Sequence, residues 1–207
     1  MRTPIIALVL LVLGPATSAA QTAAAAEERV WSLSATMAGY VLPDEDDYAQ
    51  PTFTADRGVL HLEARCNYEA LRTASLWAGY AMRGGERVEW ELTPMVGAVF
   101  GATDGLAPGF VASMSWWKLD GYIEGEYVFA RASGDSFAYH WSEVAIAPFD
   151  SLRVGMATQR TRAYATDREV QRGPFVNATF ERIDAAAYVF IRADVKPTLV
   201  LSLGFTF

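Results

Sequence analysis

The chain has 207 residues, of which 52% are apolar, 13% aromatic and 20% charged, and its formal net charge is −7. Such an abundance of aromatic and apolar residues excludes a disordered chain, and the length fits one or two domains. The acidic balance disfavours nucleic-acid binding, because it repels phosphate. A single cysteine excludes a disulfide framework and a thiolate zinc cluster.

Residues 1–20 have the layout of a secretory signal peptide. Arg2 supplies the positive end, an apolar run extends from Ile5 to Leu13, and small residues lead to a cleavage site after Ala20. The apolar run covers only about half of the roughly 20 residues that a transmembrane helix needs. We therefore predict export and cleavage.

Residues 21–30 are predicted to form a flexible leader, and residues 31–207 a single domain in which apolar and polar residues alternate. In the segment 59–68, Leu60 and Leu62 alternate with His61, Glu63 and Arg65, which is the period of two expected for a β-strand. The alternation recurs in the segments 31–37, 87–93, 110–116, 123–129, 152–159, 176–181 and 199–207. Stretches rich in Gly, Pro and Asp separate these runs, at 43–51, 83–86, 102–109, 119–121, 132–135, 148–151, 182–184 and 194–197.

Alternation of this kind fits a soluble β-sheet protein or a membrane barrel, whose apolar face meets lipid and whose interior is polar. Three features favour the barrel: charged residues are dense on the polar faces, the last alternating strand ends at Phe207, and aromatic residues gather near predicted strand ends. These aromatic residues are Trp31, Tyr68, Tyr80, Trp116, Trp117, Phe129, Phe137 and Tyr139. We predict an all-β fold, a single antiparallel transmembrane β-barrel. The alternative is a soluble periplasmic β-barrel that binds a small apolar ligand.

The segments DRGVLHLEARCNYE, ASLWAGY, LTPMVGAVFG, EGEYVFA, YHWSE, QRTRAY and LVLSLGFTF carry a resemblance to a known group. The chain resembles the small β-barrel proteins of the outer membrane of Gram-negative bacteria. The resemblance implies a place in the cell outer membrane, with outer-membrane lipid and lipopolysaccharide as partners. It also implies insertion by the barrel-assembly machinery through the C-terminal strand, with Phe205 and Phe207 as the assembly signal. It implies no particular activity, because such barrels include pores, enzymes, adhesins and structural members.

The strand number follows from the direction of the last strand, which must run toward the periplasm. Counting back makes the strand that starts at Arg57 the first upward one and predicts ten strands, an even number as bacterial barrels require. Residues 31–41 are then left over. Joined to a split segment, they would give twelve strands; otherwise they lie outside the wall.

The polar faces place a set of charged side chains in the lumen. They are Glu63, Arg65, Glu89, Glu91, Glu124, Glu126 and Arg153, with Arg87, Glu143, Glu181 and His61 expected there or nearby. They could line a narrow pore that concentrates cations, or Glu–Arg pairs could brace a closed wall. The excess of acids over arginines indicates interior water. We predict a small passive channel or a structural envelope protein, without catalytic activity and without a cofactor, metal ion or nucleic-acid partner.

An enzyme remains the alternative because His140 and Ser142 stand two residues apart, as in the His–Ser motif of outer-membrane lipid hydrolases, which the pair resembles. Glu143 points to the opposite face of the strand, so no third member is identified. The polar segment 160–173 carries four arginines that could contact lipopolysaccharide phosphates bidentately. They are Arg160, Arg162, Arg168 and Arg172.

Overall fold

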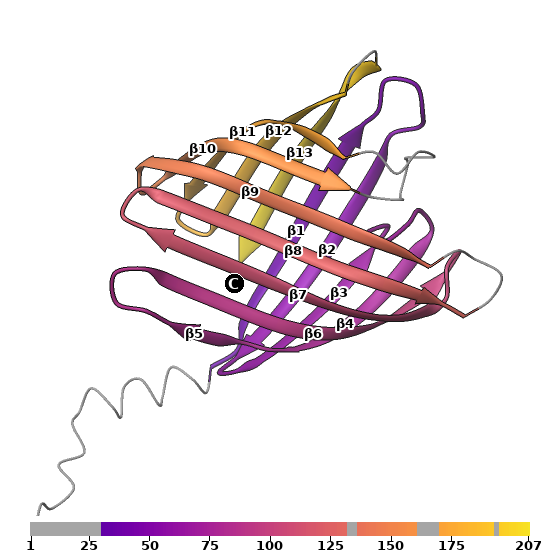
Figure 1. Ribbon diagram of the computed structural model, residues 1–207, viewed down its shortest axis with the longest axis horizontal. Coiled ribbons are helices and arrows are strands. Elements are labelled where there is room, and N and C mark those ends of the chain that lie inside the picture. The colour runs from indigo at the N-terminus through magenta and orange to yellow at the C-terminus, as the bar shows by residue number, and fades with distance from the viewer. Residues whose placement is uncertain (1–29, 132–135, 161–169, 193–194) are drawn as a thin grey trace, which may run out of the picture.

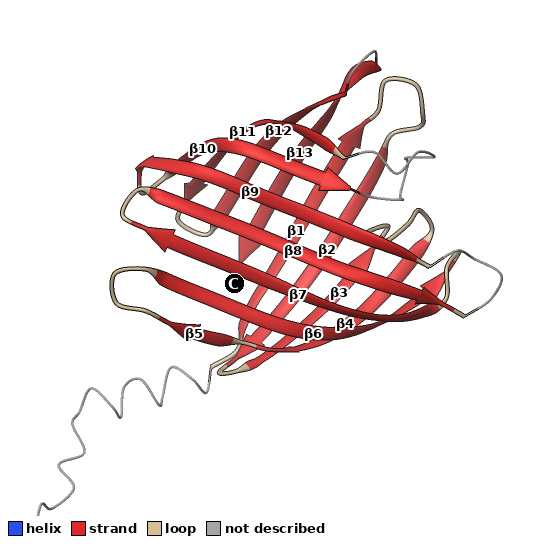
Figure 2. Cartoon of the chain, viewed as in Figure 1, coloured by secondary structure: helices blue, strands red, loops and turns tan. Residues whose placement is uncertain are grey.

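The computed structural model describes residues 30–131, 136–160, 170–192 and 195–207 (Figure 1). All regular secondary structure in these ranges is β-strand (Figure 2). The predicted signal peptide, residues 1–20, and residues 21–29 of the predicted leader lie outside the described residues. No helix of the described part is long and apolar enough to span a membrane.

The strands follow one another as hairpins along the chain. They are β1 (Ser32–Val41), β2 (Tyr48–Arg57), β3 (Leu60–Cys66), β4 (Thr73–Tyr80), β5 (Met82–Gly84), β6 (Glu89–Gly101), β7 (Gly105–Trp116), β8 (Leu119–Ala130), β9 (Phe137–Phe149), β10 (Leu152–Arg160), β11 (Gln171–Phe180), β12 (Ile183–Arg192) and β13 (Val195–Thr206).

The sheet closes on itself because β1 pairs with both β2 and β13. Only Ala81 separates β4 from β5, and both pair with β6, so they share one position in the wall. The described residues therefore form a closed antiparallel barrel of 12 strands. The predicted all-β antiparallel barrel is confirmed.

The structure confirms twelve strands, the alternative count, and not the ten that the prediction favoured. The prediction gave residues 43–51 to a turn and began the wall at Arg57, whereas residues 48–57 form β2. Pro51 lies inside this run and hides it, because proline cannot donate to a ladder. In the structure Pro51 lies opposite Met37 of β1, and the segment that the prediction left over takes a place in the wall.

The two ends of the barrel differ. Short turns connect β2 to β3, β7 to β8, β9 to β10 and β11 to β12, and Ser32 and Thr206 lie at this same end, which we call the short-turn end. The opposite end carries the connections 42–47 and 67–72, and we call it the loop end.

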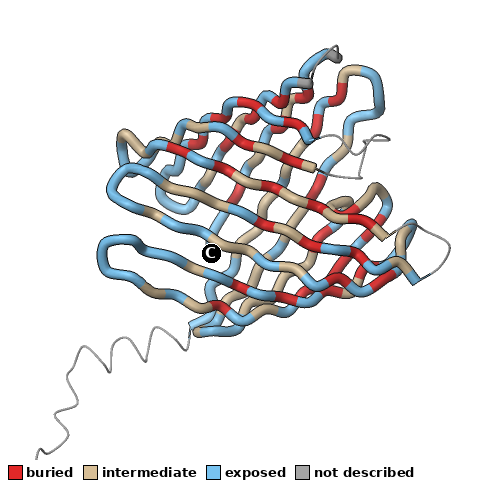
Figure 3. Tube along the Cα trace, in the orientation of Figure 1, coloured by how far each residue is buried: buried red, intermediate tan, exposed pale blue. Residues whose placement is uncertain are grey.

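Buried and exposed residues alternate along the strands (Figure 3). In β9 the side chains of Tyr139 and Trp141 are buried, while Val144 is 68% exposed and Ile146 is 52% exposed. Large apolar side chains thus cover much of the outer surface, and polar and aromatic side chains fill the interior. A soluble β-barrel has the reverse arrangement, since its apolar face forms the core.

Three of the eight aromatic residues expected near the strand ends point into the barrel. Phe137 and Tyr139 share the inward face of β9 with Glu143, and both are buried. Tyr68 was expected on the outward face of a continuing strand, but β3 ends at Cys66 and the chain turns at Asn67, which has a φ of 55°. These three rings thus lie near strand ends, as expected, but they face the interior of the barrel. Trp31, Tyr80, Trp116, Trp117 and Phe129 are exposed on the outside.

One close contact between neighbouring strands depends on a missing side chain. Trp77 of β4 lies directly opposite Gly97 of β6, and its indole ring covers the glycine. A Cβ atom on Gly97 would lie 2.4 Å from Cδ2 of Trp77. Because Trp77 also donates through Nε1 to Glu69 and Ser75, its ring has little freedom to move away.

We predict that Gly97→Ala lowers the free energy of unfolding by about 1–3 kcal/mol, the usual cost of overpacking. The matched control is Gly39→Ala, because a Cβ atom there has 3.8 Å to its nearest neighbour, the carbonyl oxygen of Leu201. Denaturant unfolding in detergent micelles, followed by tryptophan fluorescence, measures both. Equal unfolding midpoints for the two variants would contradict the packing argument.

Candidate functional site

Arg65 of β3 is the centre of a charged network inside the barrel. Its side chain is 4% exposed, its Nε donates to Glu63, and its Nη1 donates to Oε2 of Glu126 at 3.1 Å. Its guanidinium also lies over the rings of Tyr68 and Trp77, 4.3 and 4.8 Å from their centroids. Since β3 and β8 are four positions apart in the wall, the bond to Glu126 crosses the lumen.

His61 extends this network toward the short-turn end. Its Nδ1 lies 2.6 Å from Oδ1 of Asp56, and its Nε2 lies 2.8 Å from Oε1 of Glu63. A line of alternating acidic and basic groups therefore runs from Asp56 through His61, Glu63 and Arg65 to Glu126. This arrangement satisfies charges whose unpaired burial would cost several kcal/mol each.

Tyrosine hydroxyls, and not arginines, satisfy Glu124 of β8. Tyr122 donates to Oε2 at 2.8 Å, Tyr139 donates to Oε1 at 3.0 Å, and Tyr68 donates to Oε1 as well. Burial, and then the nearby charge of Glu124, raise the pKa of the Tyr68 hydroxyl well above its ordinary value. This hydroxyl therefore stays protonated and remains a donor.

A second charged group lies on the neighbouring strands. Arg153 of β10 donates through Nε to Oδ1 of Asp120 at 3.0 Å and through Nη2 to Oε2 of Glu143 at 3.2 Å. The other oxygen of Glu143 accepts from Nε1 of Trp141 at 3.0 Å and from the hydroxyl of Tyr188 at 2.9 Å. A comparison of carboxylates with arginines alone misses these donors, because tyrosine and tryptophan count as apolar in a sequence pattern.

Two cavities follow one another inside the barrel. The larger, which we call the vestibule, has a volume of about 870 Å³ and lies at the short-turn end; the smaller, the inner chamber, has about 230 Å³. Tyr122, Glu143 and Tyr188 line both, so they form the waist between the two. The inner chamber is bounded on its other side by Tyr68 and Tyr40.

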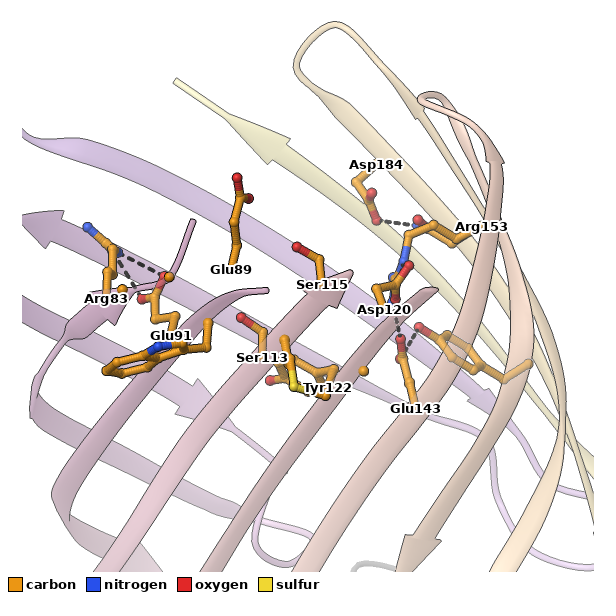
Figure 4. Close-up of a pocket in the computed structure, with 17 residues that line it drawn as sticks. Arg83, Glu89, Glu91, Ser113, Ser115, Asp120, Tyr122, Glu143, Arg153 and Asp184 are labelled. Carbon is orange, nitrogen blue, oxygen red and sulfur yellow. Dashed lines mark hydrogen bonds and ion pairs between the residues drawn. The ribbon is translucent and has the colours of Figure 1, made fainter. Parts of the chain in front are cut away.

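The vestibule is acidic. Figure 4 shows Arg83 beside Glu91 on one side and Arg153 between Asp120 and Glu143 on the other. Its charged lining consists of Glu89, Glu91, Asp120, Glu143 and Asp184 with Arg83 and Arg153. Carboxylates therefore outnumber arginines among the described residues that line this cavity.

The residues predicted to face the lumen fall into two groups. Glu89, Glu91 and Arg153 line the vestibule, and Glu124 lines the inner chamber. Glu63, Arg65 and Glu126 belong to the buried network of ion pairs that crosses the lumen. Arg87 and Glu181, also expected inside, lie instead in exposed turns, because β6 begins at Glu89 and β11 ends at Phe180.

His140 and Ser142 lie on the outward face of β9, on the opposite side from Glu143. Oγ of Ser142 lies 2.6 Å from Oγ1 of Thr158 on β10. No hydrogen bond joins Ser142 to His140 in the described part of the chain. The two residues of the expected lipid-hydrolase motif are thus present on one face but are not assembled as nucleophile and base.

The remaining predicted contact residues lie on the outside, as far as the described ranges extend. Arg160 ends β10 and Arg172 is exposed on β11, both at the loop end. Arg162 and Arg168 lie outside the described residues. At the short-turn end, the rings of Phe205 and Phe207 pack edge to face with centroids 4.9 Å apart, and the backbone N–H of Phe207 donates to the carbonyl of Leu33.

A closed wall of 12 antiparallel strands, apolar outside and charged inside, is the architecture of porin-like barrels. The fold is similar to that of a solved structure described as KdgM porin in complex with disordered oligogalacturonate. The TM-score is 0.52 and the sequence identity is 8%, and the alignment covers 85% of this chain and 98% of that chain. At this identity the likeness concerns the fold. No protein-family model matches the chain, and no curated protein matches it either.

We predict that Arg65→Gln lowers the free energy of unfolding by about 3–5 kcal/mol, because it leaves Glu126 buried without its cation and Glu63 with His61 alone. Arg83→Gln is the control: its ion pair with Glu91 is exposed, and its loss should cost about 0–1 kcal/mol. Arg65→Lys keeps the charge but loses the forked geometry, so its stability should fall between the other two. Unfolding midpoints in detergent micelles give the order, and an Arg65→Gln variant as stable as Arg83→Gln would contradict it.

Proposed function

We propose that this protein is an outer-membrane barrel that acts as a small passive channel with a preference for cations. The observation that carries the proposal is the acidic vestibule, where five carboxylates face two arginines inside a closed wall. A carboxylate-lined passage concentrates cations and repels anions. The fold that the chain shares with a protein described as a porin supports the channel class.

The apolar outer surface of the barrel supports insertion into a lipid bilayer. Leu76, Val144 and Leu203 are each more than half exposed, and comparable side chains cover neighbouring strands. Apolar surface on this scale is rare on soluble monomers. The soluble alternative, with an apolar cavity inside, is disfavoured because the interior holds ion pairs and hydroxyl groups.

The orientation follows from the lengths of the connections. Outer-membrane barrels have short periplasmic turns and longer extracellular loops. In the proposed orientation the short-turn end and its vestibule face the periplasm, and the loop end faces the outside. Arg160 and Arg172 then lie where lipopolysaccharide phosphates would meet them, and Phe205 and Phe207 lie at the periplasmic rim, in reach of the assembly machinery.

We expect the chain without residues 1–20 to require detergent or lipid for solubility, and to migrate differently on gels before and after boiling. Both properties follow from an apolar outer wall and a closed ladder of strands. Cell fractionation checks the location directly. Recovery of the protein in the soluble periplasmic fraction, without detergent, would contradict the membrane proposal.

In planar bilayers we expect discrete conductance steps that favour K⁺ over Cl⁻. Glu89→Gln should lower the K⁺/Cl⁻ permeability ratio about fivefold, because a unit charge about 8 Å from a path through water stabilises a cation and destabilises an anion by about 0.5 kcal/mol each. Glu181→Gln is the matched control, since Glu181 lies exposed in a turn at the same end. A ratio that favours Cl⁻, or one that both variants change equally, would contradict the role of the vestibule.

A further inference from the structure

We infer that the connection between β3 and β4, residues 67–72, is a displaceable plug of the lumen, and that the hydroxyl of Tyr68 latches it to the far wall. The inference rests on the proposed channel function. It concerns the loop end, whereas the ion preference depends on the vestibule at the other end.

The backbone conformation at the two ends of the loop reverses the chain direction, and this directs the loop into the barrel. Asn67 and Arg72 have φ values of 55° and 60°, in the left-handed region that residues other than glycine rarely adopt. The backbone N–H of Asn67 donates to the carbonyl of Thr73, and the N–H of Arg72 donates to Oδ1 of Asn67. These bonds close the neck of the loop, so residues 68–71 project inward between β3 and β4.

The tip of the loop reaches the opposite wall. The Tyr68 hydroxyl bonds to Glu124 of β8, and its ring lies 5.0 Å from the ring of Tyr139 on β9, measured between centroids. Tyr68 and Leu71 also pack against the aromatic cluster that fills this part of the interior, which includes Tyr40. The loop therefore spans the lumen.

The loop also stands at the end of the cavity system. Tyr68 lines the inner chamber, which opens through its waist of Tyr122, Glu143 and Tyr188 into the vestibule. Since residues 67–72 belong to the loop end, Tyr68 separates the two joined cavities from that end. Its withdrawal would extend the inner chamber toward the outside.

The attachments of the loop divide into fixed and releasable ones. On its own side, Nδ2 of Asn67 donates to the carbonyl of Ala49 at 2.9 Å, and Oε1 of the fully buried Glu69 accepts from Ser75 and Trp77. On the far side, the polar contacts in the described residues all come from the Tyr68 side chain. No rung of the β3–β4 ladder includes the loop, because pairing begins at Cys66 and Ala74. The tip can thus leave the far wall without opening the sheet.

The test is single-channel recording of the refolded full barrel in planar bilayers, with three variants beside the wild type. Tyr68→Phe removes the latch and keeps the ring. Tyr127→Phe is the matched control, since Tyr127 lies on the outward face of β8. In the third variant two glycines replace residues 68–71, which removes the plug but leaves Asn67 and Arg72 in place. Heat-modifiable gel migration verifies that each variant is folded.

We expect Tyr68→Phe to raise the open probability about tenfold at unchanged unit conductance, because a hydrogen bond to a charged group is lost. The two-glycine variant should raise the unit conductance itself, and Tyr127→Phe should behave as the wild type. Conductance that is present and equal in the wild type, Tyr68→Phe and the two-glycine variant would overturn the plug and leave the channel standing. An increase with two glycines but not with Tyr68→Phe would overturn the latch. Silence from all four folded proteins would overturn the channel function itself.

Discussion

Each carboxylate buried inside the barrel must have a hydrogen-bond donor or a cation beside it, and the arrangement of the interior follows from this requirement. Where side chains fill the barrel there is no room for bulk water, so each buried acid there needs a cation or a hydrogen-bond donor. Arg65, Arg153 and His61 satisfy some of the acids across or along the wall, and tyrosine hydroxyls satisfy Glu124. The choice of tyrosine has an electrostatic result: a hydroxyl satisfies the oxygen without cancelling its charge. Glu124 is therefore bonded without a cation, whereas Oε2 of Glu69 and Oε1 of Glu126 are buried without a hydrogen-bond partner among the described residues.

The same bonds reconcile two interpretations that the sequence leaves in competition, the braced wall and the acid-lined pore. Bonds that cross the lumen gather around Arg65 and Glu124, in the part next to the β3–β4 loop, whereas the vestibule is hollow and its ion pairs stay on the wall. The crossing bonds and the hollow part thus occupy different lengths of one barrel. In the proposed channel, the bonded part would support the loop, and the vestibule would set the charge that a passing ion meets.

The strands of the wall were predictable from the sequence wherever the alternation of apolar and polar residues marks them. The period of two identifies most strands and puts Glu124 and Arg153 on inward faces, because alternation is a property of neighbouring residues. What failed depends on distant residues. β2 stays hidden by Pro51 until β1 supplies its partner, and Tyr68 turns inward only because the chain reverses at Asn67. The bond from Arg65 to Glu126 joins strands far apart in the sequence, and no spacing rule reveals it.

The seam between β1 and β13 also has a kinetic side. Ser34 pairs with Thr206, so the last ladder of the wall joins residues from opposite ends of the described chain. The other ladders between whole strands join neighbours in the sequence, whose loop-closure entropy is small. The hairpins can therefore form early and in any order, whereas the barrel closes only when β13 has formed and can pair with β1. Until that moment β1 presents an unpaired edge, the feature through which open sheets aggregate. During assembly, pairing of β1 with β13 therefore competes with aggregation through the unpaired edges. The rate at which this one ladder forms determines how much of the protein closes into a barrel.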